Sequence, residues 1–167
     1  MRKLIGVALF AGLCGGLAEM GWITLYSSAS TISAVGVARE ITATIFATAA
    51  YAPWAPLAGI GIHLALSAVL GLTFLFALLG FSRTAPTGPE VWIASVIALT
   101  CIWAINFFWV LPVLNPAFVT LMPYAVTLAS KMLFAIAMAG VLQFTVTDDA
   151  KRRGSVAVRP SYYPIKR

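Results

Sequence analysis

Four side chains that carry charge or strong hydrogen bonds fall inside long apolar stretches of this chain: Glu19, His63, Asn106 and Lys131. A carboxylate, an imidazole, an amide and an ammonium in one layer can relay protons, hold an ion or bind a ligand, and ionisable groups at membrane depth are functional by default. The alternative is structural: an ion pair between Glu19 and Lys131, braced by His63 and Asn106, that fixes helix register. An unpaired charge costs at least about 2.5–3.5 kcal/mol on insertion scales, which favours pairing.

Other kinds of chemistry have no counterpart in the sequence. It contains no nucleophile and base pair, no Gly-rich phosphate loop and no metal-spaced cluster. We therefore predict no catalytic residues, no metal site and no catalytic activity for the chain alone. No cofactor is expected either, except that His63 leaves open a haem contact, whose second axial ligand would have to be a methionine or come from a partner chain.

The composition indicates an integral membrane protein. Of the 167 residues, 61% are hydrophobic and 10% are charged, whereas a soluble domain is closer to half apolar and a quarter charged. The net charge of +6 is concentrated in the tail, where six of the eleven basic residues follow Ala150. This charge is a signal of membrane topology, and no nucleic-acid partner is expected.

Four apolar segments are long enough to cross a bilayer, which takes about 20 residues. They are Leu4–Tyr26, Pro56–Leu79, Val91–Leu111 and a fourth that ends near Val146. The fourth begins either at Ala117 or at Pro123, since proline is favoured as a first helical residue. The predicted fold class is an all-α membrane protein, with a four-transmembrane-helix bundle in residues 1–147 and a basic cytoplasmic tail in residues 148–167.

A shorter segment between the first two spans is amphipathic. From Ser33 to Ala50, apolar residues recur at helical spacing, with Glu40 and Thr44 on the other side. This pattern predicts a helix that lies in the membrane interface or packs across the ends of the bundle. An ordinary amphipathic connector is the plainer interpretation.

The basic residues predict the orientation. With four spans, nine of them lie on the side of the two termini, and Arg39 alone lies on the other side. The positive-inside rule then places both termini in the cytoplasm, in a bacterial inner membrane.

Depth and face suggest where the polar side chains meet. On a helix, Glu19 shares its face with the small residues Ala8, Gly12 and Gly16, so a neighbouring helix can come close. At 1.5 Å per residue all four polar side chains lie roughly 7–12 Å below the outer interface, provided that the fourth helix starts at Pro123. We therefore expect the first and fourth spans to pack together and to join Glu19 to Lys131.

From the second span onward, about two-thirds of the chain resembles a group of uncharacterised four-helix bacterial inner-membrane proteins, the YagU-like group. The resemblance is carried by Trp54 and Pro56, by Ile62-His63-Leu64 and Gly71, and by the turn at Pro112 and Asn115-Pro116. It implies a compact four-helix bundle and supplies no agreed activity.

Two functions remain open from the sequence. The first is a small non-catalytic subunit or accessory protein of a larger inner-membrane complex of respiratory or oxidase type, whose partners are other membrane subunits and lipid. The residues expected to contact such a partner are in the tail: Arg152, Arg153, Arg159, Tyr162 and Tyr163. The second is a dimeric transporter or channel component that uses the Glu19, His63 and Lys131 layer, with Gly12 and Gly16 as a dimer seam.

Overall fold

The protein is built from helices. The computed structural model describes residues 2–81 and 88–157, with side chains at 2–80 and 88–145, and this part of the chain contains no strand. The long helices are α1 (Arg2–Ser28), α3 (Ala55–Phe81), α4 (Pro89–Ile105) and α7 (Tyr124–Ala157). The short ones are α2 (Ala34–Ile45), η1 (Ala47–Ala49), η2 (Asn106–Val110), α5 (Leu111–Leu114) and α6 (Pro116–Leu121).

Four stretches of helix are long and apolar enough to cross a membrane. They are Arg2–Ser28, Ala55–Gly80, Pro89–Leu114 and Tyr124–Thr145. These correspond to the four predicted spans, and the prediction of an all-helical chain with four such helices is confirmed. Their number and composition indicate a multi-pass membrane protein.

The fourth span starts directly after Pro123 and not at Ala117. Helix α6 ends at Leu121, Met122 is extended, and α7 begins at Tyr124. The carbonyl of Pro123 accepts the first hydrogen bonds of α7, from the backbone N–H groups of Val126 and Thr127. Proline at such a position loses no bond, because its missing N–H would be unpaired in any case. At its other end α7 continues to Ala157, so the first part of the predicted tail is helical.

The third span differs from the prediction at its end. We expected a turn from Pro112 to Pro116, but the helix passes through Pro112 and ends only at Leu114. The reason is the π-helical turn η2, in which the N–H of Leu111 bonds to the carbonyl of Asn106, five residues back. Proline cannot bond to the carbonyl four residues before it, and the wider turn directly before Pro112 lets the helix continue around it.

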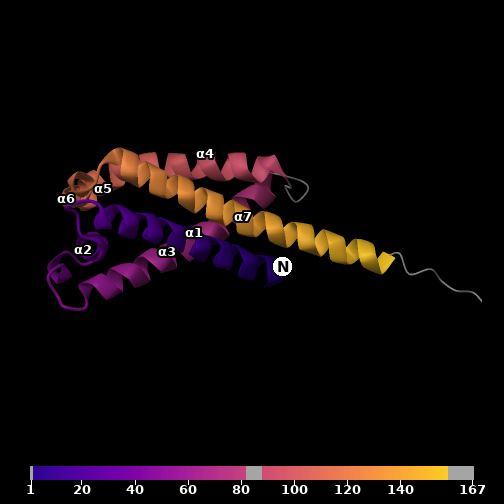
Figure 1. Ribbon diagram of the computed structural model, residues 1–167, viewed down its shortest axis with the longest axis horizontal. Coiled ribbons are helices and arrows are strands. Elements are labelled where there is room, and N and C mark those ends of the chain that lie inside the picture. The colour runs from indigo at the N-terminus through magenta and orange to yellow at the C-terminus, as the bar shows by residue number, and fades with distance from the viewer. Residues whose placement is uncertain (1, 82–87, 158–167) are drawn as a thin grey trace, which may run out of the picture.

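The long helices are arranged in the spatial order α3, α1, α7, α4 (Figure 1). Helix α1 packs against both α3 and α7, and α4 packs against α7, whereas α3 and α4 make no substantial contact. The order in space is therefore not the order in sequence, and α3 and α4 form the two edges of the bundle.

Small residues bring α1 and α3 into backbone contact. A Cβ atom on Gly12 would collide with the carbonyl of Ser67, and one on Gly71 would collide with the carbonyl of Ala8. Without side chains at these two positions the helices approach closely, as small-residue faces allow in membranes. The face of small residues on α1 was predicted to let a neighbouring helix come close, and that neighbour is α3.

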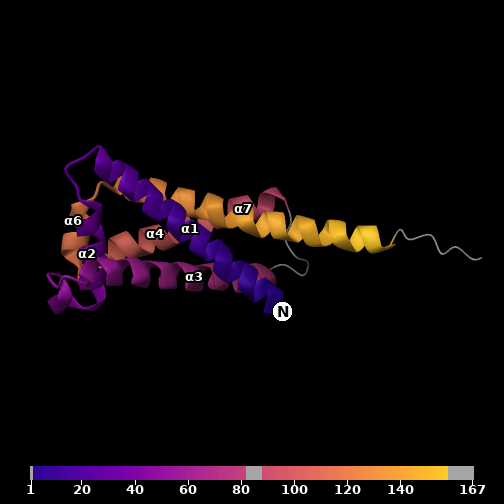
Figure 2. The same ribbon diagram turned by 60° about the horizontal axis from the view of Figure 1, so that its bottom comes forward.

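The bundle is wider at one end than at the other. We call the end that carries α2 and α6 the α2 end, and the end where α1 begins the terminal end. Toward the terminal end one apolar core joins all four long helices; its largest buried side chains include Phe74, Leu99, Phe134 and Met138. Toward the α2 end α1 and α3 diverge, and α2 and α6 lie across the opening (Figure 2).

Helix α2 is held on one side by α3 and on the other by the α6 segment. On the α3 side, Gly59 lies against the Ala38 carbonyl, and the buried Thr42 hydroxyl donates to the carbonyl of Ala55. On the α6 side, Asn115 Nδ2 donates to Glu40 Oε2 at 3.0 Å and to Thr44 Oγ1 at 3.2 Å. Helix α2 therefore packs across the end of the bundle, which is one of the two predicted arrangements; its position in a membrane interface stays a prediction.

Candidate ligand groove

Glu19 and Lys131 form an ion pair between α1 and α7. Lys131 Nζ donates to Glu19 Oε2 at 2.7 Å, and the Ser130 hydroxyl donates to Glu19 Oε1 at 3.1 Å. The residue Glu19 is only 9% exposed. The predicted pairing of Glu19 with Lys131, and with it the packing of the first span on the fourth, is confirmed.

His63 lies beside the pair, as predicted. Its Nε2 atom is 3.8 Å from Glu19 Oε2 and 3.4 Å from the carbonyl oxygen of Gly16. A Cβ on Gly16 would make only an ordinary contact with Nε2, at 3.6 Å, but it would collide with the side chain of Ser67, one turn after His63 on α3. Since Nε2 faces two oxygen atoms, that nitrogen does not fit an axial haem ligand, which needs an open position.

Asn106 does not brace the pair, and in this respect the prediction is wrong. Within the described part of the chain its side-chain amide makes no hydrogen bond, and the brace is Ser130 instead. Ser130 was missed because a helical serine usually bonds within its own helix. Its hydroxyl does so here as well, at 2.7 Å from the carbonyl of Thr127, and shares its hydrogen between that carbonyl and Glu19.

All four predicted polar residues line a single groove of about 800 Å³ at the α2 end. The edge helices α3 and α4 form its two walls, α1 and α7 form its floor, and α2 and the α6 segment cover its end. Glu19 and Lys131 lie on the floor, His63 comes from the α3 wall, and Asn106 comes from the opposite wall, at the first residue of η2. This volume is in the range of small-molecule sites, about 300–1,000 Å³.

The rest of the groove is mostly apolar. Aliphatic side chains such as Ile60, Leu66 and Ile105 line the walls, and the rings of Phe107 and Phe134 lie deeper. Leu66 and Ile105 are each about half exposed, 59% and 49%, so they mark the open side between α3 and α4. In a membrane this side would face the lipid chains.

The α4 wall is fixed to α7 by an aromatic cluster. Trp103 stacks on Phe107 and makes an edge contact with Tyr124, and its indole N–H donates to Thr127 Oγ1 at 3.0 Å. The α3 wall is held separately, by α1 and α2. The two walls are therefore held by different elements, and no substantial contact joins α3 to α4. This keeps the groove open between them.

Other predicted site residues lie elsewhere. Near the terminal end, the side-chain oxygen of Gln143 accepts a hydrogen bond at 3.2 Å from the N–H of Gly88, before α4. The tail residues Arg152 and Arg153 belong to α7, but their side chains are outside the described ones; Arg159, Tyr162 and Tyr163 lie outside the described residues altogether.

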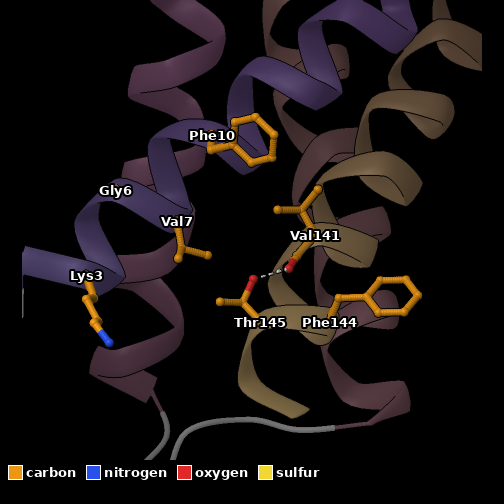
Figure 3. A pocket seen from close by; sticks show the side chains of 7 residues that line it. All are labelled: Lys3, Gly6, Val7, Phe10, Val141, Phe144 and Thr145. Carbon is orange, nitrogen blue, oxygen red and sulfur yellow. Dashed lines mark hydrogen bonds between the residues drawn. The ribbon is translucent and has the colours of Figure 1, made fainter. Parts of the chain in front are cut away.

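A second, shallower pocket of about 540 Å³ lies between α1 and α7 near the terminal end (Figure 3). Its wall is apolar and includes Val7, Phe10 and Phe144. Figure 3 shows the Thr145 hydroxyl turned to the carbonyl of Val141 in its own helix, at 2.7 Å. Lys3 is then the remaining polar group of this pocket, which makes it a much less polar site than the groove.

In the described part of the chain, no three metal-ligating side chains come together. No protein-family model, no curated protein and no solved structure matches the chain. The resemblance to the YagU-like group stays a prediction.

Proposed function

We propose that this protein is a non-catalytic multi-pass protein of the bacterial inner membrane that acts by binding an amphiphilic ligand in the groove between α3 and α4. The observation that carries this proposal is the groove itself: apolar walls open on one side, over a floor that holds the Glu19 and Lys131 pair. Ligand sites typically combine a largely apolar lining with a few convergent polar groups. A ligand with an apolar tail and a polar end fits both parts.

In the proposed orientation both termini are cytoplasmic, because the basic residues cluster on their side. The α2 end, and with it the groove, then belongs to the outer half of the bilayer. A ligand would enter sideways from the outer leaflet, between α3 and α4, without leaving the membrane.

Filling the groove should remove the ligand. Ile105→Trp places a large ring in the groove, whereas Ile97→Trp makes the same change at a comparably exposed site on α4 outside it, 58% against 49%. Each protein would be purified in a mild detergent and its bound small molecules identified by native mass spectrometry. We expect the natural chain and Ile97→Trp to retain a defined molecule that Ile105→Trp lacks; the same mixture of bulk phospholipids in all three would refute the proposal.

Membership of a larger membrane complex is a second proposal, favoured by the shape of α7. This helix runs past the span that ends at Thr145 and projects beyond the other helices at the terminal end (Figure 1). A projecting basic segment suits contact with a partner subunit or with anionic lipid headgroups. Deleting residues 155–167 should release co-purifying subunits while the melting temperature of the bundle stays unchanged; retained subunits would count against this role.

A dimeric transporter built on Gly12 and Gly16 receives no such support. Both glycines are buried in the contact of α1 with α3, where Ser67 approaches each of them. A dimer would need a different surface.

A further inference from the structure

We infer that the ligand is an uncharged lipid whose polar end carries carbonyl oxygens, the chemistry of an isoprenoid quinone. This inference rests on the proposed function and adds the ligand class. It follows from the charge of the groove, from its unused hydrogen-bond donors and from its shape.

The charges that line the groove cancel. Glu19 and Lys131 are the charged side chains among its described lining residues, and they are bonded to one another at 2.7 Å. A ligand with a net charge would have to break this pair to find a counter-ion, and separating a buried pair leaves an uncompensated charge. An uncharged ligand leaves the pair intact.

Among the described residues, Lys131 and Asn106 leave hydrogen-bond donors unused in the groove, and the side-chain oxygen of Asn106 is an unused acceptor beside them. Both carboxylate oxygens of Glu19 are already acceptors, one for Ser130 and one for Lys131. The ammonium of Lys131 has three N–H groups, of which one is directed at Glu19. Across the groove, the Asn106 amide has two further N–H groups that meet no acceptor in the described part of the chain. A ligand rich in acceptor oxygens satisfies these donors; one that offers chiefly donors does not.

The shape of the groove suits a flat ring with a long tail. Phe118, which is half-buried, presents aromatic surface within it, whereas the rings of Phe107 and Phe134 are buried. Aromatic rings prefer stacked or edge contacts with other rings. The gap at Leu66 and Ile105 lets an isoprenoid chain extend into the bilayer. Among membrane molecules, a prenylquinone combines carbonyl oxygens on a neutral ring with such a chain.

Decylubiquinone, a short-tailed quinone, tests this inference directly. Its binding to the purified protein in detergent would be measured by the quenching of tryptophan fluorescence, with dioleoylglycerol and phosphatidylethanolamine as competitors. We expect saturable binding that neither lipid displaces at equal concentration. Binding that does not saturate, or that phosphatidylethanolamine displaces, would overturn the inference.

Variants locate the site. Asn106→Leu removes donors from the groove and should weaken binding roughly three- to tenfold, the worth of about one hydrogen bond. Thr100→Val makes a similar change on the same helix outside the groove and should leave the dissociation constant unchanged. Equal affinity in Asn106→Leu and the natural chain would refute the assigned role of the donors.

The same experiments separate this inference from the proposal that it rests on. If Ile105→Trp loses a bound molecule that is not a quinone, the groove is a ligand site but the ligand class is wrong. If Ile105→Trp binds decylubiquinone and retains the same molecules as Ile97→Trp, the groove is not the site and both proposals fall.

Discussion

The two oxygens of Glu19 are held by consecutive residues of one helix. Ser130 donates to Oε1 and Lys131 donates to Oε2. Burying an ion pair is favourable only when further hydrogen bonds satisfy the charged groups, and Ser130 supplies one of them. The carboxylate is therefore positioned by α7 alone, while His63 approaches from α3.

Breaking one partner of the pair should cost more than removing both. Glu19→Gln or Lys131→Met leaves the other charge without its counter-ion, and each should destabilise the protein by about 2–4 kcal/mol. The double substitution should recover part of this loss. Unfolding in detergent, followed by circular dichroism, gives the double-mutant cycle.

Glu90→Gln is the matched control, because it makes the same change at an exposed site at the start of α4. Its stability should equal that of the natural chain. If the two single substitutions are as stable as this control but lose ligand binding, the pair serves only the site and the structural interpretation is wrong.

The sequence predicts the pair better than it predicts its surroundings. Glu19 and Lys131 are the opposite charges at membrane depth, and their depths agree once α7 starts after Pro123. Depth, however, says nothing about rotation around a helix axis. This is why Asn106 could be placed at the correct height and still be assigned a bond that Ser130 makes.

At the scale of elements, two devices determine the form of the bundle. The first is the glycine contact that brings α1 and α3 together at Gly12 and Gly71. The second is Asn115, whose side chain both caps α6, by accepting from the N–H of Phe118, and ties that segment to Glu40 on α2. The first was visible in the sequence as a face of small residues. The second was not, because the position of Asn115 before a helix indicates only a cap, and its bond to Glu40, 75 positions away, depends on the fold.

A methyl group on Gly12 should force α1 and α3 apart. Gly12→Ala places a Cβ against the Ser67 carbonyl, which is rigid backbone, and overpacking of this kind typically costs about 1–3 kcal/mol. Gly6→Ala, on the same helix with open space around it, should not destabilise the protein. Equal melting temperatures for the two variants would show that the helices are not in backbone contact.

Loss of the Asn115 side chain should loosen the cover of the groove. Asn115→Ala removes the cap and the bonds to Glu40 and Thr44, and we expect a loss of about 1–3 kcal/mol. Faster amide hydrogen exchange in α2 should accompany it. Thr120→Ala is the control, since that exposed hydroxyl bonds only to the carbonyl of Ala117 in its own helix; similar exchange in both variants would contradict the link.

At the scale of the whole molecule, the edge positions of α3 and α4 create the groove. Hydropathy gives the number and length of the spans, but every order of four apolar helices has the same hydropathy. The groove was therefore beyond prediction from the sequence. What the sequence did indicate, a layer of four polar residues at one depth, is the part of the lining that carries its chemistry.

Cysteine labelling tests the proposed orientation in whole cells. In a chain from which Cys14 and Cys101 have been removed, Thr48→Cys at η1 should react with a membrane-impermeant maleimide added outside the inner membrane. Ser161→Cys, in the tail, should react only after the cells are opened. Labelling of Ser161→Cys in intact spheroplasts would show that the protein has the opposite orientation.

The pair between α1 and α7 also has a consequence for biogenesis. Glu19 enters the membrane with the first helix, and Lys131 follows 112 positions later, with the last one. Until α7 arrives, the carboxylate has no cation beside it, which is costly in lipid. A chain that is truncated before α7 therefore keeps an unpaired carboxylate in its first helix. Membrane proteases should degrade it faster than the same truncated chain with Glu19→Gln.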